Sequence, residues 1–237
     1  MLQKYILPLK SHLNRDLAVW TGASLVTTAV YTIVTTMYFP DMMPIITEII
    51  GTFLTLTCVG LITKQNLWCW PFGIGGVILL GYAFFVYGLI STAILHIAFF
   101  LPMQFHGWYQ WMNGEQSERQ VSSIGVIRAM LLMAVIFAGP ALVWAAYIPD
   151  IAAFLGDSVP QIPLADSAIM WFSVAAQILM NYKILENWIF WIVLDIIAVI
   201  IYFISGMYMV SALYMIFLYI AGAGLLEWSK DYRRIQK

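Results

Sequence analysis

The stretch between Asn187 and Phe203 contains one ionisable residue, Asp195, and it begins with two tryptophans, Trp188 and Trp191. A carboxylate near the centre of a bilayer costs a few kcal/mol at least on insertion scales. Indoles can stack on a flat heteroaromatic ring, and a cation over an indole gains roughly 1–2 kcal/mol. The carboxylate could face a positive charge or a sugar hydroxyl. These residue types predict a site for a flat organic molecule.

The spacing of these residues places them together on one helix. Trp188, Trp191, Asp195 and Tyr202 are three, four and seven residues apart, so they share one helix face. Asp195 would lie about 12 Å from the cytoplasmic end of this helix, near the middle of a hydrocarbon core of about 30 Å. Two alternatives stay open. Trp188 could belong to an interfacial aromatic belt, and Asp195 could have a purely structural partner, although no Lys or Arg lies at membrane depth.

Other polar and aromatic side chains lie in or beside apolar segments and are further substrate-binding candidates. They are Gln104, His96, Gln177, Tyr214, Trp70 and Asn66, in addition to Tyr202. Gln104 follows Pro102, which should kink its helix. For Gln104 the alternative is hydrogen bonding between helices, for His96 a packing role, and for Trp70 and Asn66 a place at the membrane interface.

The composition of the whole chain is typical of a membrane protein. The chain has 237 residues, of which 62% are hydrophobic and only 10% charged, whereas soluble domains carry about 25% charged residues. We therefore predict an all-α integral membrane protein with eight transmembrane helices. The expected spans are residues 17–39, 43–63, 70–87, 90–112, 124–148, 164–182, 187–204 and 207–228.

The charged residues fix an expected orientation. With both termini in the cytoplasm, all 11 Lys and Arg residues fall on the cytoplasmic side. The other side would hold five acids, namely Asp41, Glu48, Asp150, Asp157 and Asp166. This distribution obeys the positive-inside rule, which an even number of spans satisfies. Glu48 is expected to be a solvated charge at a helix end.

The sequence repeats internally. A shift of 118 residues superposes Trp70 on Trp188 and His96 on Tyr214, whereas Trp111 and Trp228 agree after a one-residue gap. The expected parts are an N-terminal cytoplasmic segment and anchor helix (1–42), a three-helix repeat (43–113), a linker helix (114–150), a second repeat (151–230) and a cytoplasmic tail (231–237). Parallel repeats of this kind are a transporter architecture, with substrate held between the halves near the midplane.

The motif Trp188, Trp191 and Asp195 in "YKILENWIFWIVLD" resembles the PnuC family of bacterial vitamin transporters, as do "HGWYQW" and the segment "GMYMVSALYMIFLYIAGAGLLEW". The resemblance covers about residues 43–230. It implies a SWEET-like 3+1+3 fold and uptake of nicotinamide riboside, with thiamine or riboflavin as the substrates of relatives. It also implies facilitated diffusion, with a cytoplasmic kinase trapping the vitamin as a phosphate ester. Some family members carry Asn at the position of Asp195, so the vitamin itself is open.

Other functions have little support in the sequence. No His-Glu-x-x-His, Gly-x-Ser-x-Gly or Walker motif occurs, so we expect no metal, no cofactor and no enzymatic activity. The basic residues are spread over five segments, which suits membrane topology and not nucleic-acid binding. The expected partners are a small-molecule vitamin and the lipid bilayer, with a homo-oligomer possible. The expected location is the bacterial inner membrane. An intramembrane enzyme using Asp195 and His96, and a receptor-like protein, are the remaining alternatives.

Overall fold

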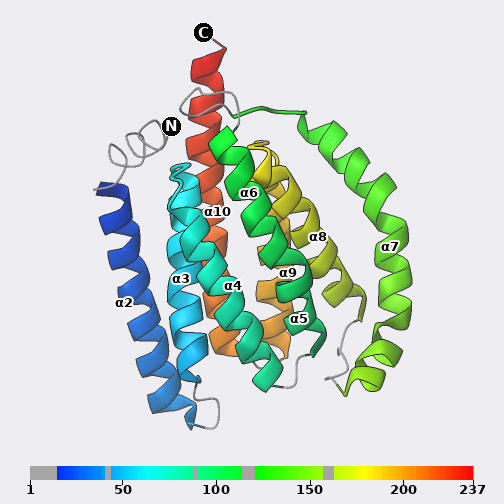
Figure 1. Ribbon diagram of the computed structural model, residues 1–237. Helices are drawn as coiled ribbons and strands as arrows, with labels where there is room; N and C mark the ends of the chain where they lie inside the picture. The colour runs from blue at the N-terminus through cyan, green and yellow to red at the C-terminus, as the bar shows by residue number, and fades with distance from the viewer. Residues whose placement is uncertain are drawn as a thin grey trace. The chain divides into compact units, whose positions relative to one another are not determined.

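The computed structural model describes residues 15–40, 44–87, 90–113, 121–156, 163–205 and 207–236. Helices make up its regular structure, and a single isolated bridge joins Ser122 to Ile184 within the described residues. The helices are α2 (Arg15–Tyr38), α3 (Ile46–Thr63), α4 (Cys69–Val86), α5 (Ile90–Ile94), the π-helical turn η2 (Leu95–Phe100), α6 (Leu101–Asn113), α7 (Val126–Leu155), α8 (Pro163–Asn181), α9 (Asn187–Ile204) and α10 (Tyr208–Ile235) (Figure 1). The prediction of an all-α membrane protein is confirmed.

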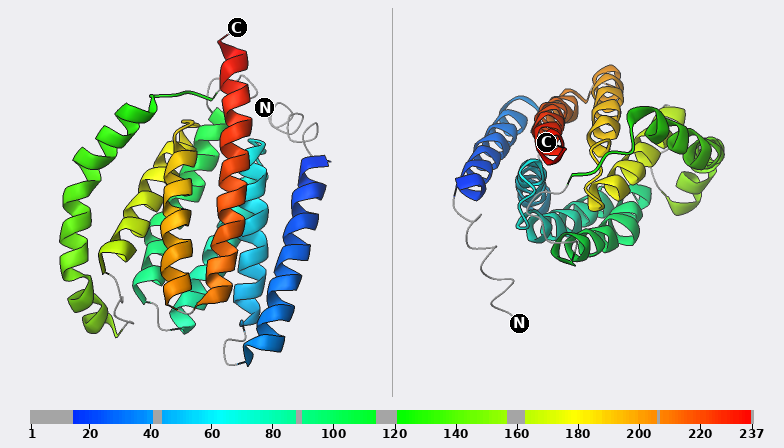
Figure 2. Two further views of the ribbon diagram at one scale, coloured as in Figure 1. Left: turned by 180° about the vertical axis from the view of Figure 1, so that it is seen from behind. Right: turned by 90° about the horizontal axis from the view of Figure 1, so that it is seen from above.

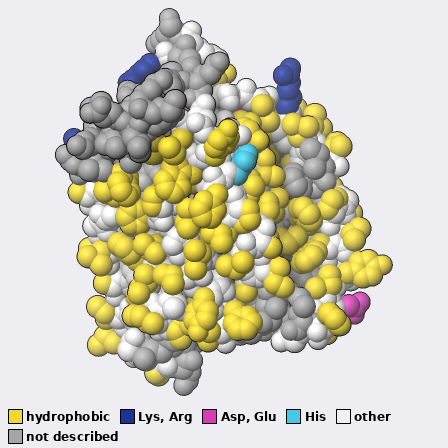
Figure 3. Space-filling model, viewed as in Figure 1, with side chains coloured by type: hydrophobic (Ala, Val, Ile, Leu, Met, Phe, Trp, Pro, Cys, Tyr) yellow, Lys and Arg dark blue, Asp and Glu magenta, His cyan; other side chains and the backbone are white. Residues whose placement is uncertain are grey.

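Five of these helices are long and apolar enough to cross a membrane by themselves: α2, α3, α4, α9 and most of α10. A sixth span results if the two halves of α7 are counted as one. The exposed side chains of the helices are largely hydrophobic, as lipid contact requires (Figure 3). The expected count of eight spans stays a prediction, because α8 is shorter and the segment 90–113 is divided into three pieces.

The linker helix α7 is bent. Its parts Val126–Val135 and Ala138–Tyr147 meet at 45°, and Pro140 lies just after the bend. A proline cannot donate to the carbonyl four residues earlier, which here is that of Ile136, and its ring clashes with that carbonyl. The helix also extends to Leu155, beyond the expected end at residue 148.

The described residues form two compact units, which we treat separately. One unit contains α2, α3, α4, η2 and α6, and the other contains α7, α8, α9 and α10. In the first, α3 packs against both α2 and α4, and α4 contacts η2 and α6. In the second, α9 packs between α8 and α10, and α7 packs on α8 (Figure 2). The domain boundaries expected from the sequence stay a prediction.

The two repeats share their backbone in detail. Helices α4 and α9 both have 18 residues and begin 118 positions apart. The turns before them contain Gln65 and Lys183, also 118 apart, and each has a φ of 52°. Few side chains other than glycine adopt a positive φ. The same unusual conformation at equivalent positions therefore shows that the internal repeat extends to the backbone of these turns.

A tryptophan pair packs in the same way in each repeat. The rings of Trp70 and Trp111 meet edge to face with centroids 5.0 Å apart and planes at 86°. Trp188 and Trp228 form the equivalent pair, at 5.4 Å and 88°. Edge-to-face contacts at this separation are favourable for aromatic rings. Each pair ties the second helix of its repeat to the third.

The π-helical turn η2 explains the one-residue gap in the sequence repeat. Tyr214 lies 118 residues after His96, but Trp228 lies only 117 after Trp111, so the first repeat has one extra residue between these positions. In η2 the Leu101 N–H bonds to the carbonyl of His96, five residues earlier. Such a turn takes up one extra residue inside an α-helix. It lets Trp111 reach Trp70 despite the insertion, and it places the irregularity before Pro102.

The N-terminal helix α2 is attached to the first repeat near both of its ends. A Cβ on Gly60 of α3 would lie 2.3 Å from the ring of Trp20, so this indole packs directly on the glycine. Toward the other end, the Tyr31 hydroxyl donates to the Glu48 carboxylate at 3.0 Å, and so does the Tyr87 hydroxyl. Glu48 lies in the first turn of α3, as expected, but it is half-buried and accepts two tyrosine hydroxyls, so it is not simply a solvated charge.

Candidate functional site

Asp195 is held inside the second unit by α9. This helix consists almost entirely of large apolar side chains and has neither Gly nor Pro, which favours an unbroken helix at membrane depth. Asp195 is only 3% exposed. Burying a carboxylate among apolar side chains is costly, so this position is a strong candidate for contact with a polar or cationic ligand.

Two tyrosines lie near this acid. The rings of Tyr202 on α9 and Tyr214 on α10 are stacked, with centroids 5.3 Å apart and planes at 26°. Their hydroxyls are hydrogen-bonded, and Tyr214 interacts electrostatically with Asp195. Phe217 continues the group with an edge-to-face contact to Tyr214 at 6.0 Å. The structure thus brings three predicted residues, Asp195, Tyr202 and Tyr214, into one aromatic and acidic cluster.

Trp188 does not present an open surface on which a ligand ring could stack, although the sequence had suggested one. It is 1% exposed and packs against Trp228. A Cβ on Gly224 of α10 would lie 2.5 Å from its six-membered ring, so the indole rests on the backbone of α10. This geometry favours a packing role, although its indole N–H is buried without a partner among the described residues.

Trp191 lies at the edge of the same helix face and is more accessible. It is half-buried and packs against a small apolar cluster made by Ala129, Ala176 and Phe190. These three residues come from α7, α8 and α9 respectively. The cluster supports one side of the indole, and part of the ring stays exposed.

A buried polar stripe runs along α8. Ser173, Gln177 and Asn181 are four residues apart and all buried, so they lie on one face. The side-chain amide of Gln177 donates to the Asn181 carbonyl at 2.9 Å. The sequence singled out Gln177, but Ser173 was missed, and its four-residue spacing from Gln177 could have revealed it.

Asn187 was also missed. It is buried at the start of α9, and its side-chain oxygen has no hydrogen-bond partner among the described residues. Its amide donates to the carbonyl of Ile184 at 2.6 Å. In the sequence Asn187 looked like a polar residue at a helix boundary, where such residues are common. Its burial, which makes it a candidate ligand, could be seen only in the structure.

In the first unit, Gln104 is the most pronounced candidate. It is buried on α6, and its side-chain oxygen has no partner within the described part of the chain. A Cβ on Gly73 of α4 would lie 2.4 Å from this oxygen and 2.9 Å from the sulfur of Cys58. The amide therefore occupies the space that the absent side chain of Gly73 leaves.

His96 lies in the π-helical turn η2 and is half-buried. Its Nδ1 is 2.9 Å from the carbonyl oxygen of Thr92. The ring lies between Phe84, at 4.9 Å, and Phe100, at 5.3 Å. This arrangement fits the alternative of a packed histidine as well as it fits a ligand.

The last two candidates lie at the α3–α4 turn. Trp70 is wholly buried in its pair with Trp111, so it is not an exposed interfacial residue. The side-chain oxygen of Asn66 accepts the Trp68 backbone N–H at 3.0 Å, which stabilises the turn. No group of three His, Cys, Asp or Glu side chains that could hold a metal ion occurs among the described residues.

Comparison with known proteins agrees with this architecture. The family model described as nicotinamide mononucleotide transporter matches residues 45–230. The nicotinamide riboside transporter PnuC of Escherichia coli (strain K12) is 28% identical over 209 residues, covering 78% of this chain and 86% of that protein. The riboflavin/roseoflavin transporter RibM of Streptomyces davaonensis is 25% identical over 194 residues, covering 79% and 86%.

The fold has a counterpart among solved structures. The crystal structure of a vitamin B3 transporter PnuC superposes with a TM-score of 0.65 and covers 93% of both chains, at 22% identity. The match of the family model extends over both repeats and the linker helix, and so over most of the chain. The chain therefore belongs to the nicotinamide mononucleotide transporter family, and as a relative of the PnuC proteins it is a membrane-embedded vitamin transporter and not an enzyme.

Proposed function

We propose that this protein carries nicotinamide riboside into the bacterial cytoplasm and that Asp195 contacts the vitamin. The observation that carries the proposal is the buried carboxylate of Asp195, which interacts with Tyr214, one of the stacked pair Tyr202 and Tyr214. Nicotinamide riboside has a flat pyridinium ring and ribose hydroxyls. A carboxylate at low dielectric attracts such a cation more strongly than it does in water, and tyrosine rings favour flat cations.

The other candidate residues would contribute to binding in different ways. Trp191 would stack on the ring of the vitamin, because its indole is supported on one side and accessible on the other. Gln177 and Gln104 would donate or accept hydrogen bonds with the amide or ribose, and His96 and Asn66 would contribute from the first repeat. Trp70, although a candidate by sequence, would mainly pack against Trp111. Trp188 would mainly hold α9 against α10.

The identity of the vitamin is the first point to test. Thiamine is the alternative, because its thiazolium is also a flat cation. Riboflavin must be included, since a relative of similar identity is a riboflavin/roseoflavin transporter. Calorimetric titration of purified protein with the three vitamins should show tightest binding of nicotinamide riboside. Tighter binding of either other vitamin would overturn the assignment.

The mode of transport is proposed to be facilitated diffusion. Asp195 is the only acid at mid-membrane depth within α9 and α10, and a proton relay normally needs a chain of ionisable residues. A cytoplasmic kinase would then trap the vitamin as a phosphate ester, without a stable complex. In proteoliposomes, uptake should stop at equal concentrations on both sides. Accumulation driven by a proton or sodium gradient would contradict the proposal.

The location and orientation belong to the same proposal. We place the chain in the bacterial inner membrane with both termini in the cytoplasm, as the positive-inside rule predicts. Labelling of single cysteines introduced at the two ends, in intact cells and in lysed cells, tests this orientation. A homo-oligomer stays a prediction.

A further inference from the structure

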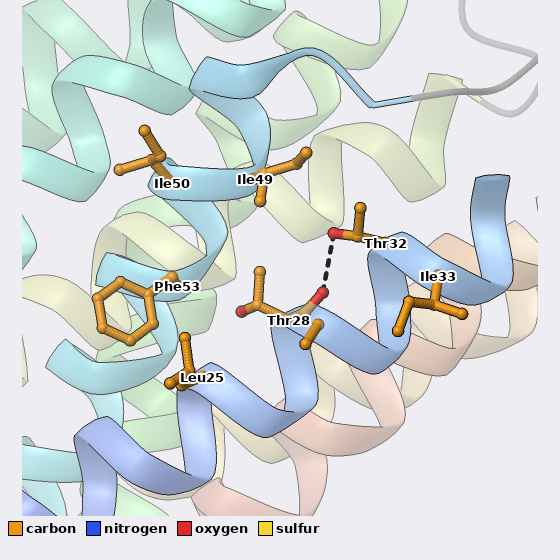
Figure 4. Close-up of a pocket in the computed structure, with 8 residues that line it drawn as sticks. Leu25, Thr28, Thr32, Ile33, Ile49, Ile50 and Phe53 are labelled. Carbon is orange, nitrogen blue, oxygen red and sulfur yellow. Dashed lines mark hydrogen bonds between the residues drawn. The ribbon is translucent and has the colours of Figure 1, made fainter.

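A cavity of about 450 Å³ lies between α2 and α3, and none of the ten candidate residues lines it. Its lining comes from Leu25, Thr28, Ala29, Thr32 and Ile33 of α2 and from Ile49, Ile50 and Phe53 of α3. Figure 4 shows Leu25, Thr28 and Thr32 facing the side chains of α3 across this space. We call it the α2–α3 groove.

Two of the contacts between α2 and α3 lie near the ends of the groove. Trp20 packs on Gly60 at one end, and Tyr31 is hydrogen-bonded to Glu48 at the other. The lining includes the small side chains of Thr28, Ala29 and Thr32, which leave space between the two helices.

The lining is almost entirely hydrocarbon. The Thr32 hydroxyl is satisfied, because it donates to the Thr28 carbonyl at 2.9 Å. Only the Thr28 hydroxyl is left, buried and without a partner among the described residues. Leu25, Ile33 and Ile50 on the rim are exposed, and on membrane-spanning helices exposed apolar side chains face lipid. The groove thus opens toward the bilayer and offers a ligand packing, with no charge to bind a headgroup.

The depth of the groove indicates one half of the bilayer. Counted from Arg15, the residues from Leu25 to Ile33 lie about 15 to 27 Å along α2, within a hydrocarbon core of about 30 Å. Ile49 to Phe53 lie within about 10 Å of the beginning of α3. With the N-terminus in the cytoplasm, both stretches fall in the outer half of the membrane.

We propose that the α2–α3 groove binds one acyl chain of a phospholipid from the outer leaflet. A hydrophobic driving force is absent inside a bilayer, since lipid tails are as apolar as the groove. The gain comes from filling a void whose walls would otherwise lack packing partners. The bound chain completes the contact between the N-terminal helix and the first repeat.

The test is photolabelling in proteoliposomes made with phosphatidylglycerol whose acyl chain carries a diazirine. After illumination, peptide mapping by mass spectrometry should find the label concentrated at Leu25, Ile33 and Phe53. Ala29→Phe fills the groove and should reduce labelling of Phe53 at least fivefold, whereas Ala29→Leu should give an intermediate reduction. Val30→Phe adds the same bulk outside the lining and should leave labelling unchanged.

Several results would overturn the proposal. Uniform labelling of all exposed faces of α2, unaffected by Ala29→Phe, would mean that lipid contacts the helix without binding in the groove. Cross-links between copies at position 29 would mean that a second copy fills the groove. A loss of labelling in Thr28→Val would mean that the hydroxyl recognises a polar ligand, since an acyl chain makes no use of it. Each variant is compared only after size-exclusion chromatography shows one monodisperse species, and the graded Leu variant keeps the test valid if the Phe variant does not fold.

Discussion

The two repeats have the same backbone at their central turns but different side chains where a ligand could bind. Gly73 in the first repeat is equivalent to Trp191 in the second, and Val77 is equivalent to Asp195. After the one-residue insertion, Gln104 is equivalent to Ala221. In the first repeat, Gly73 on the second helix leaves space that the side chain of Gln104, on the third helix, occupies. In the second repeat, the second helix carries Trp191 and Asp195, and the equivalent residue on the third helix is the buried Ala221.

This comparison separates structure from function within each repeat. The features that recur, such as the tryptophan pairs and the positive φ of Gln65 and Lys183, build the corner between helices. The features that do not recur supply polar groups to only one copy. We infer that the shared residues maintain the fold and that Trp191, Asp195 and Gln104 give the copies their separate tasks.

A further difference lies at the first residue before each second helix, which is Trp68 in one repeat and Glu186 in the other. Glu186 is buried and accepts the backbone N–H groups of Ile124 at 3.2 Å and Gly125 at 3.0 Å, as well as the Ser123 hydroxyl. It thereby satisfies donors just before α7, where a carboxylate is also favoured by the helix dipole. In the second repeat, the residue at this position therefore fixes the start of the linker helix.

The largest effect is expected for the tryptophan pairs. Trp70→Ala and Trp188→Ala should each destabilise the protein by about 3–5 kcal/mol, because each leaves a large cavity in equivalent packing. Thermal unfolding in detergent should show similar decreases in Tm for both. A clear decrease for only one would show that the two pairs are not equivalent. If Trp188→Phe, when folded, also weakens vitamin binding and Trp70→Phe does not, Trp188 has a second role as a ligand.

The next effect is expected at Glu186. Glu186→Gln keeps the shape but replaces a charged acceptor of three hydrogen bonds, which should cost about 1.5–3 kcal/mol. The control is Lys230→Gln, which removes the surface contact of Lys230 to Glu227 at 3.7 Å and should cost less than about 1 kcal/mol. Thermal unfolding of both variants should show a larger decrease in Tm for Glu186→Gln than for the control. Equal values would mean that the anchoring of α7 contributes little.

A smaller and more selective effect is expected for Trp191. Trp191→Ala should weaken vitamin binding by about 1–2 kcal/mol through lost ring contact, which corresponds to roughly 5- to 30-fold. Trp191→Phe should retain part of the affinity. Phe190→Leu is a matched control, because Phe190 belongs to the same apolar cluster but to another side of α9. If the control lowers affinity as much as Trp191→Ala, the indole acts only through packing.

The smallest effect on binding is expected for the π-helical turn. Deletion of Ala98 removes the extra residue and should convert η2 to regular α-helix while keeping the flanking faces in register. Binding should change less than about threefold, whereas transport should slow if the turn is a point of movement. Vitamin binding and proteoliposome uptake are measured on the same preparation. Unchanged uptake would reduce η2 to a tolerated insertion.

The sequence predicted most of the fold because apolar length and the repeat are local signals. The predicted span 187–204 coincides with α9, and most other predicted ends lie within three residues of the structure. It did not predict the binding of Glu48 by two tyrosines, because this depends on neighbours distant in sequence. The bend of α7 was also not predicted, although Pro140 is a local signal for it. For Glu48 the residue type suggested solvation, and only tertiary contacts showed otherwise.

The candidate site was predictable by residue type but not by environment. An acid inside an apolar helix identified Asp195, and the structure showed Tyr214 interacting with it and Tyr202 stacked on Tyr214. Trp188 and Trp191 looked equivalent in sequence because helix periodicity separates them by only 60°. Their surroundings differ, since Trp188 meets Gly224 and Trp228 on α10, whereas Trp191 packs toward α7 and α8.

Calorimetric titration of nicotinamide riboside into the parent protein and Asp195→Ala tests the central claim most directly. Loss of the charge-assisted contact should weaken binding by roughly 1.5–3 kcal/mol, or 10- to 100-fold. Val77→Ala, at the equivalent position of the first repeat, should leave the affinity unchanged. Both variants must first show one monodisperse species. If Asp195→Ala binds the vitamin as tightly as the parent protein, the acid is structural and the proposed site is wrong.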